Sequence, residues 1–323
     1  MLADCEIVCN VGRNEGWELS QWNHAAMMKV WLDTDIGSDV DDAVALLCAI
    51  RHPDIELVGI STVMHRVEIN SWLAQEMLRR AGLTGIPVLS GAAVRLGGDA
   101  AAEDASDWTP SHGRLAPPLP RLSARDDAPR VELIAQAMLG VPEPYHLLTV
   151  GPLTNAARLL RDHPDASKRW LSVTCMGGWL EARAEYNVEC DIEASRTVMA
   201  HTAPKMVGLE ASSYTLTREE VEVALDPSDA VSAFLLDCYR EYRTNAGWLK
   251  DEEGKPMTLF DAITLIAMVR PELFTLQQVK ILLEKDGRMR LTDDGVPVTY
   301  AMACNWDRVK PVILDLMRGA TAG

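Results

Sequence analysis

The sequence predicts an α/β fold built on an open, mostly parallel, doubly wound sheet within a single large domain. Short runs of apolar residues alternate along the chain with stretches of helical length, which is the strand–helix order of parallel sheets. The apolar runs are nearly continuous, as is typical of strands that are covered on both faces. With 323 residues, of which 48% are hydrophobic and 24% are charged, the chain is long enough to bury a large core.

Six segments are expected to form strands, and helices are expected between several of them. The strands are predicted over residues 29–33, 55–63, 86–91, 145–151, 170–178 and 205–210. Helices are predicted over residues 41–52, 71–82 and 153–164, and apolar residues at 3.6-residue spacing predict two more over 229–243 and 259–271. Ligands of such sheets bind beyond the carboxyl ends of the strands, so polar motifs that follow strands should converge on one edge.

The domain is expected to span residues 29–319, between a weakly ordered extension at residues 1–28 and a tail at 320–323. The extension carries charged residues and no apolar h-region, so it is not expected to be a signal peptide. Met27 or Met28 could therefore be the natural start of the protein.

The net charge and the distribution of apolar residues limit the kinds of partner that the protein can bind. The net charge of -16 disfavours nucleic-acid backbones and anionic membranes, so we expect a protein that acts on small molecules. No apolar run approaches the ~20 residues of a membrane helix. The seven cysteines are scattered, without a CxxC pair or zinc spacing, which predicts reduced thiols in a cytoplasmic protein.

Five aspartates fall within ten residues where a predicted strand ends and a predicted helix begins, namely Asp33, Asp35, Asp39, Asp41 and Asp42. Two carboxylates about 4 Å apart repel by ~1 kcal/mol in water and by ~4 kcal/mol at an effective dielectric constant of about 20. The dipole of the following helix offsets only ~0.3–1 kcal/mol per exposed charge. The cluster therefore predicts a bound cation, and ligands that are all oxygen favour Ca²⁺ or Mg²⁺ over zinc. The alternative is a solvated acidic turn in which one aspartate caps the helix.

Two other motifs share this aspartate pattern. An EF-hand loop that starts at Asp33 would need glycine at position 38 and glutamate at position 44, where this chain has Ser38 and Val44. A phosphatase of the haloacid-dehalogenase type also opens with a strand and D-x-D, with Asp33 as nucleophile and Asp35 as acid. The later lysine and acidic motifs of that family have no clear match here, so a metal-dependent phosphatase is only an alternative.

The stretch DTDIGSDVDDAVA, residues 33–45, resembles the opening motif D-x-D-P-G-x-D-D-A-x-A of the nucleoside hydrolase family, the inosine–uridine type of N-ribohydrolase. Similar motifs follow in the family's order, namely LVGISTV, VLSGA, HG at 112–113, VGPLTNAARLL, MGG at 176–178, EYNVECDIEA at 185–194 and LFDAITL around Asp261. Because this ordered set spans most of the chain, the chain is identified as a divergent member of the family.

The resemblance implies a Ca²⁺ site. Asp35 would bind the ion and accept the proton of the attacking water. Asp42 and Asp261 would be further ligands, and the backbone carbonyl of Val150 would complete the set. This chemistry is reasonable because a bound Ca²⁺ can hold a vicinal diol and lower the pKa of a water beside a carboxylate.

The resemblance also implies a ribose site beside the metal. Asp41 and Asn187 would hold the ribose hydroxyls, with Glu185 near the 5′-hydroxyl. The opening motif has two extra residues, so Asp39 competes with Asp41 for the diol. Anionic surroundings at the sugar would stabilise the positive charge of an oxocarbenium-like transition state.

The base side of the site departs from the family pattern. Phe260 stands where many members have a histidine, and it could stack on a base or pack in the core. Arg66 replaces a substrate-facing asparagine. Residues 95–130 form a long, polar, proline-rich stretch that is either a binding loop or a disordered segment. In it, Trp108 could stack on a base or make a lid contact. The loop that carries His112 should overhang the edge of the sheet.

The remaining expectations follow from the resemblance. The activity would be Ca²⁺-dependent hydrolysis of the N-glycosidic bond of a ribonucleoside or related riboside, in a homodimer or homotetramer. The alternatives are a member that binds ribosides without hydrolysing them and the phosphatase described above. His65, His112 and His201 are expected to be structural or incidental, and of the three His112 has the best claim to a function.

Overall fold

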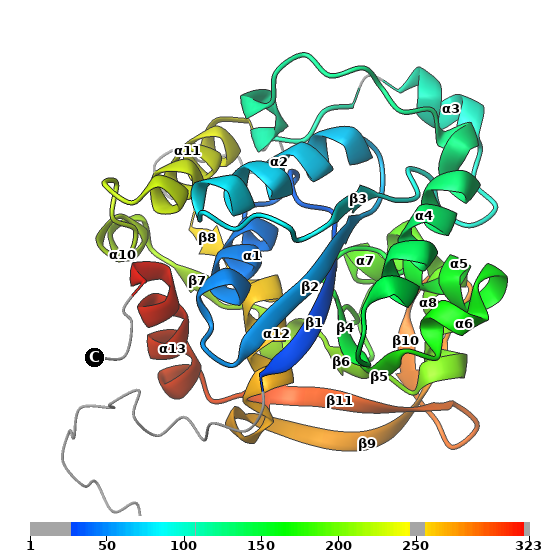
Figure 1. Cartoon of the computed structure of the whole chain (residues 1–323). Helices are drawn as coiled ribbons and strands as arrows, with labels where there is room; N and C mark the ends of the chain where they lie inside the picture. The colour runs from blue at the N-terminus through cyan, green and yellow to red at the C-terminus, as the bar shows by residue number, and fades with distance from the viewer. Residues whose placement is uncertain (1–26, 107, 246–255, 320–323) are drawn as a thin grey trace, which may run out of the picture.

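A computed structural model of the chain describes residues 27–106, 108–245 and 256–319. Its centre is a nine-stranded sheet with the strand order β10-β9-β11-β6-β5-β4-β1-β2-β3 (Figure 1). The extension expected at residues 1–28 falls almost wholly outside the described residues, and the expected tail at 320–323 lies outside them too.

The six strands expected from the sequence form the parallel part of this sheet. They are β1 (Met28–Thr34), β2 (Ile55–Thr62), β3 (Val88–Ser90), β4 (Tyr145–Thr149), β5 (Trp170–Met176) and β6 (Lys205–Val207). Every pairing among them is parallel, and β1 lies between β2 and β4. The expected fold class is confirmed.

Three further strands extend the sheet beyond β6, and the sequence analysis did not predict them. They are β9 (Phe274–Leu283), β10 (Met289–Leu291) and β11 (Val296–Cys304). β9 pairs antiparallel with both β10 and β11, whereas β11 is parallel to β6. Much of β9 is exposed, so its sequence lacks the continuous apolar run of the buried strands. The Asp-Gly pairs at 286–287 and 294–295, which favour hairpin turns, were the available signal.

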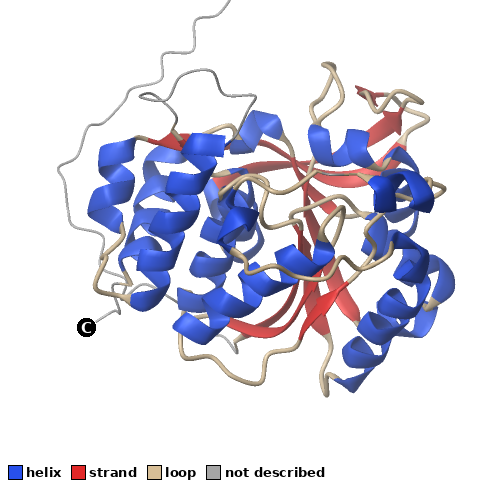
Figure 2. Cartoon of the chain, turned by 90° about the horizontal axis from the view of Figure 1, so that it is seen from above, coloured by secondary structure: helices blue, strands red, loops and turns tan. Residues whose placement is uncertain are grey.

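Helices cover both faces of the sheet (Figure 2). The larger ones are α1 (Asp41–Arg51), α2 (Val67–Arg80), α4 (Asp127–Gly140), α5 (Thr154–Asp162), α8 (Ile192–Thr202), α11 (Ala230–Asn245), α12 (Phe260–Val269) and α13 (Trp306–Arg318). The five helices expected from the sequence are present as α1, α2, α5, α11 and α12. Shorter elements are α6 (Pro164–Ser167), α7 (Tyr186–Cys190), α9 (Leu209–Ser212), α10 (Arg218–Ala224), η4 (Pro271–Leu273), β7 (Thr215–Leu216) and β8 (Met257–Thr258).

Two hydrophobic cores lie on opposite sides of the sheet, and β1 contributes to both. Val30 and Leu32 point into the core shared with α1, α2, α11, α12 and α13, whereas Trp31 points into the core shared with α4, α5 and α8. The connection after β1 therefore leads to one face and the connection after β4 leads to the other. The carboxyl ends of these two strands border a topological switch point, where sheets of this kind bind ligands.

The long stretch at residues 95–130 is folded over this edge of the sheet, and within it only residue 107 is outside the described residues. It contains α3 (Ala100–Ala105), η2 (His112–Leu115) and η3 (Ala124–Asp126) and runs into α4. Arg121 donates to the carbonyl oxygens of Ser106 and Glu103, and Ser123 donates to Asp104 at 2.7 Å. These contacts favour the binding-loop interpretation over disorder. We call residues 95–126 the lid.

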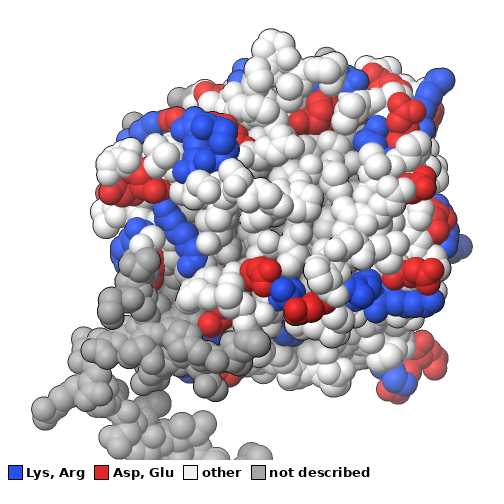
Figure 3. Space-filling view, in the orientation of Figure 1, with Lys and Arg blue, Asp and Glu red and all other residues white. Residues whose placement is uncertain are grey.

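On the face seen in Figure 3, basic and acidic side chains are interspersed around an area without charged residues. Among the helices that the structure describes, none is both long and apolar enough to span a bilayer.

Candidate functional site

A pocket of about 640 Å³ opens at the switch point. Ten of the eleven residues that the sequence analysis assigned to the site line it: Asp35, Asp39, Asp41, Asp42, Trp108, Val150, Glu185, Asn187, Phe260 and Asp261. They come from the loop after β1, the lid, the loop after β4, the start of α7 and the starts of α1 and α12. The convergence expected from strand order is therefore present.

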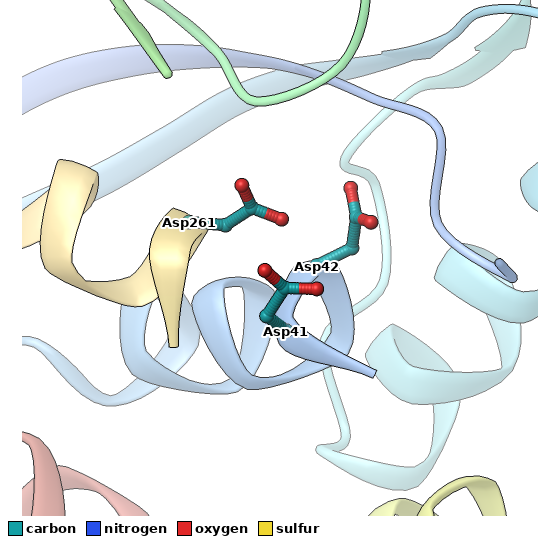
Figure 4. A group of neighbouring side chains, drawn as sticks. All are labelled: Asp41, Asp42 and Asp261. Carbon is teal, nitrogen blue, oxygen red and sulfur yellow. The ribbon is translucent and has the colours of Figure 1, made fainter. Parts of the chain in front are cut away.

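Three buried carboxylates meet at the floor of the pocket (Figure 4). Asp41 and Asp42 lie in the first turn of α1, and Asp261 lies in the first turn of α12. One oxygen from each of the three lies within 4.8 Å of the others. Thr34 donates a hydrogen bond to Asp42. Oxygens bound to one Ca²⁺ at about 2.3–2.6 Å can be no more than about 5.2 Å apart, so this donor set fits such an ion.

Asp35 lies outside this group of three, although the resemblance made it a metal ligand and made Asp41 a ligand of the sugar. It lies beside the loop that follows β4, where a Cβ added to Gly151 would be 2.6 Å from its Oδ1 atom. Glycine at position 151 therefore lets the carboxylate of Asp35 approach the backbone beside Val150. The side chain is only partly buried and faces the pocket.

The crowded acidic groups hold protons more tightly than free aspartates do. Desolvation, followed by the charge of Asp41, raises the pKa of Asp35 to about 8. Desolvation likewise raises the pKa of Asp41 to about 6. The same effect, together with the neighbouring carboxylates, raises the pKa of Asp39, Asp42 and Asp261 well above the usual value. The pocket is therefore suited to a cation that would compensate the charge.

We expect the metal-free protein to lose stability as the pH rises through the neutral range. Unfolded aspartates have a pKa of about 3.9, whereas Asp41, Asp33 and Asp35 have folded pKa values of about 6, 7 and 8. The folded state then binds more protons, so the free energy of unfolding falls between those pH values. Thermal unfolding in chelator, followed from about pH 5 to about pH 9, tests this. A melting temperature that rises over that range would contradict it, and a saturating divalent cation should flatten the dependence.

The side chain of Asn187 is hydrogen-bonded to the backbone of Val150. The Asn187 side-chain nitrogen donates to the Val150 carbonyl oxygen at 2.8 Å and lies 3.3 Å from the Met176 sulfur. The Val150 amide donates to the Asp33 carbonyl oxygen at 2.8 Å. The loop after β4 is thus tied to β1 on one side and to α7 on the other.

Glu185 is the N-cap of α7. Its carboxylate accepts hydrogen bonds from the amides of Asn187 at 3.0 Å, Val188 at 3.2 Å and Gly178 at 3.2 Å. Burial raises its pKa, and these amides act in the opposite direction. Glu185 therefore holds Asn187 in place as well as lining the pocket.

A network of buried hydrogen bonds around Asn155 and Asp33 lies behind the pocket, and the sequence analysis did not assign these residues a role. Asn155, in the GPLTN motif, donates to Asp33 at 2.8 Å and to the Thr62 carbonyl oxygen at 3.0 Å, and accepts from the Ala92 amide at 2.9 Å. Asp33 also accepts from Ser61, and it does not line the pocket. These bonds join the ends of β1, β2 and β3, and the GPLTN motif between β4 and α5 was the available signal.

Two singled-out residues, His112 and Arg66, lie outside the pocket lining, and a third, His65, contacts the lid. His112 is fully buried and is not part of the pocket lining, and burial lowers its pKa to about 3. Arg66, which takes the place of a substrate-facing asparagine of the family, pairs with Glu68 and does not line the pocket. His65 contacts Trp108 of the lid, with the ring centroids 4.5 Å apart.

Phe260 lines the pocket and also packs against the core, so its position is compatible with both roles that the sequence left open. The lining also includes residues that were not predicted, among them Arg183, Tyr186, Leu209 and Asn245. Tyr186 lies in the EYN motif but was given no role, whereas Arg183, Leu209 and Asn245 lie outside the quoted motifs and are brought to the pocket by the fold.

The sequence matches the family model of the inosine-uridine preferring nucleoside hydrolases over residues 30–311. It is 30% identical over 275 residues to the pyrimidine-specific ribonucleoside hydrolase RihA of Citrobacter koseri, and the match covers 81% of this chain and 85% of that protein. RihA of Escherichia coli is also 30% identical over 275 residues, covering 81% of this chain and 86% of its own length.

Solved structures share the fold. The inosine-uridine preferring nucleoside hydrolase of Bacillus anthracis superposes with a TM-score of 0.71 at 23% identity, covering 91% of this chain and all of that one (100%). A plant nucleoside hydrolase, PpNRh1, superposes with a TM-score of 0.73 at 23% identity, covering 91% and 99%.

Proposed function

Since the chain belongs to the family of inosine-uridine preferring nucleoside hydrolases and is thus an N-ribosyl hydrolase, we propose that it cleaves a ribonucleoside in a Ca²⁺-dependent reaction. The observation that carries the proposal is the group of three buried carboxylates in a pocket that is also lined by Asp35 and Asn187. Release of reducing sugar from a panel of ribosides tests it.

The donor atoms of the pocket support a hard divalent cation. We propose that Asp42, Asp261 and the carbonyl oxygen of Val150 hold Ca²⁺ together with Asp35, whose carboxylate lies beside the Val150–Gly151 backbone. Asp41, the third member of the carboxylate group, would then face the ribose diol on the same ion. All are oxygen donors, which Ca²⁺ prefers. When bound, the ion would polarise the ribose hydroxyls and the attacking water. Asp39 remains the competing candidate for the diol. The aspartate that binds the diol is the one whose replacement by asparagine causes the larger rise in KM.

In this proposal Asp35 is the general base that takes the proton from the attacking water. A base works best when its pKa lies near the working pH, and the pKa of Asp35 is about 8 without a cation. A bound cation would favour the charged carboxylate and lower that pKa. The surrounding carboxylates would stabilise the positive charge that develops on the ribose ring as the bond to the base breaks.

The phosphatase alternative conflicts with the position of Asp33. A nucleophile must touch its substrate, yet Asp33 is 1% exposed and its Oδ1 atom accepts hydrogen bonds from Ser61 and Asn155. The other alternative, a family member that binds ribosides without cleaving them, is distinguished from a hydrolase by measuring binding and product release together. It would bind a ribonucleoside but release neither sugar nor phosphate.

For the base, we propose activation by stacking between Phe260 and Trp108, with purine-like bases favoured over uridine. Both aromatic side chains line the pocket, and His112, the candidate proton donor of the lid, does not. The RihA relatives are named pyrimidine-specific, whereas a structural neighbour from Gardnerella vaginalis is named purine-preferring. The proposal therefore rests on the aromatic side chains of this pocket.

Replacement of Phe260 by alanine should slow hydrolysis of the natural nucleoside more than hydrolysis of a riboside with a good leaving group. Stacking on a base contributes about 1–3 kcal/mol, which corresponds to roughly 5- to 150-fold. The hydrolysis rates of wild type and Phe260→Ala on both substrates measure this difference. The wild-type enzyme itself should cleave the activated riboside much faster than uridine. Phe234→Ala is the control, because Phe234 is a buried phenylalanine outside the pocket lining. Equal losses on both substrates with Phe260→Ala would mean that another group activates the base.

Assembly and location are proposals as well. We propose a homodimer or homotetramer of the domain at residues 29–319, which light scattering would measure. Among the described residues, Cys48, Cys175, Cys190, Cys238 and Cys304 are free thiols, which supports a reducing, cytoplasmic location.

A further inference from the structure

Trp108 forms the lid side of the pocket, and one ring supports it from behind. Its half-buried indole lines the pocket, while the imidazole of His65 packs against it with ring centroids 4.5 Å apart and planes tilted by 41°. Its amide donates to the Ser106 hydroxyl at 3.2 Å. The position of the indole therefore depends on a side chain that lies outside the pocket lining.

His65 is itself held on several sides. Its amide donates to the Ala93 carbonyl oxygen at 2.7 Å, and its Nδ1 atom lies 3.3 Å from the Glu103 carboxylate. Arg121 donates to the same carboxylate at 3.1 Å. The ring is thus clamped between an anchored carboxylate and the indole.

The backbone at this point adopts an unfavourable conformation. Met64 and His65 have φ values of 65° and 54°, in the left-handed region that most residues avoid, although glycine, asparagine, aspartate and histidine enter it more often than the others. Such conformations persist where the surrounding contacts impose them, and they are frequent beside functional sites. Here the conformation directs the imidazole toward the lid.

We propose that His65 is a positioning residue that holds the indole of Trp108 against the base of the substrate, and so contributes to selection of large, flat bases. The inference rests on the proposed function of the pocket. A wall residue that is already immobilised loses less conformational freedom when the base binds. His65 should therefore affect binding of the base and leave binding of the sugar unchanged.

The test uses substitutions that separate the ring from the backbone. Asparagine tolerates the left-handed conformation, so His65→Asn removes the ring contact without added strain. His65→Phe keeps an aromatic ring and removes the contact with Glu103. We expect His65→Asn to raise KM for a purine nucleoside by roughly 2- to 12-fold, the effect of one immobilised side chain, and His65→Phe to restore most of it. Inhibition by free ribose should not change.

A double-mutant cycle provides the decisive control. In a Trp108→Ala background, His65→Asn should have little further effect on KM, because the ring that it supports is gone. An equal effect of His65→Asn in both backgrounds, or a parallel loss of ribose binding, would overturn the proposal.

The same double-mutant cycle can be measured by nucleoside binding instead of by catalysis. Nucleoside binding by calorimetry, with Asp35→Asn present throughout, should show the same fold-changes in Kd. Binding without hydrolysis by the wild-type enzyme would refute the proposed function and leave this test intact. Equal nucleoside affinity with and without His65→Asn, or no nucleoside binding at all, would refute the role of His65.

Discussion

Replacement of Asp35 by asparagine is expected to lower kcat by about 10²- to 10⁴-fold, the usual contribution of a general base. The asparagine has the same shape and cannot accept the proton. Its neighbour Asp39 also lines the pocket and also has a raised pKa, so Asp39→Asn is the matched control. We expect the control to lose far less turnover, because Asp39 is assigned neither to the base nor to the metal.

Initial rates at saturating substrate and Ca²⁺ measure this difference. Melting temperatures with and without Ca²⁺ show whether the Asp35 variant still folds and binds the ion. Mild and similar losses in both variants would show that Asp35 is not the base. A large loss with Asp39→Asn alone would show that the two extra residues of the opening motif shift the roles along the chain.

Removal of the metal is expected to abolish activity and to lower the melting temperature, and added Ca²⁺ should restore both. The floor of the pocket holds three carboxylates with oxygens within 4.8 Å of one another, and a cation relieves their repulsion. A ligand at about 100 times its Kd adds about 2.7 kcal/mol to the free energy of unfolding. At no more than about 2 °C per kcal/mol for a domain of this size, the melting temperature should rise by up to roughly 5 °C.

Asp261→Asn is the matched variant, since it removes one charge from the group and keeps its shape. It should need more Ca²⁺ for half-maximal activity and should gain less stability from the ion. Full activity in excess chelator after extensive dialysis would rule out the calcium proposal. Restoration of activity by Mg²⁺ but not by Ca²⁺ would keep a hard-cation site and change the ion.

The sequence by itself predicted the fold class and ten of the residues that line the pocket. Six buried strands were visible because parallel strands covered on both faces need continuous apolar runs. The aspartates after β1 and the asparagine of EYN were visible because their motifs resemble those of a known family. The exposed strand β9 was missed because one-sided burial leaves a weak local signal.

Only the tertiary structure decided which of these side chains meet. Asp261 joins Asp41 and Asp42 because α12 and α1 pack with their first turns together, although 219 positions separate Asp261 from Asp42. The same packing put Asp41 rather than Asp35 in the group. His112 is buried away from the pocket because η2 packs against α11 and α2. The spacing of apolar residues in a strand or helix can be recognised within a short stretch of the sequence. The distance between two carboxylates depends on how helices dock across a sheet, which only the folded core sets.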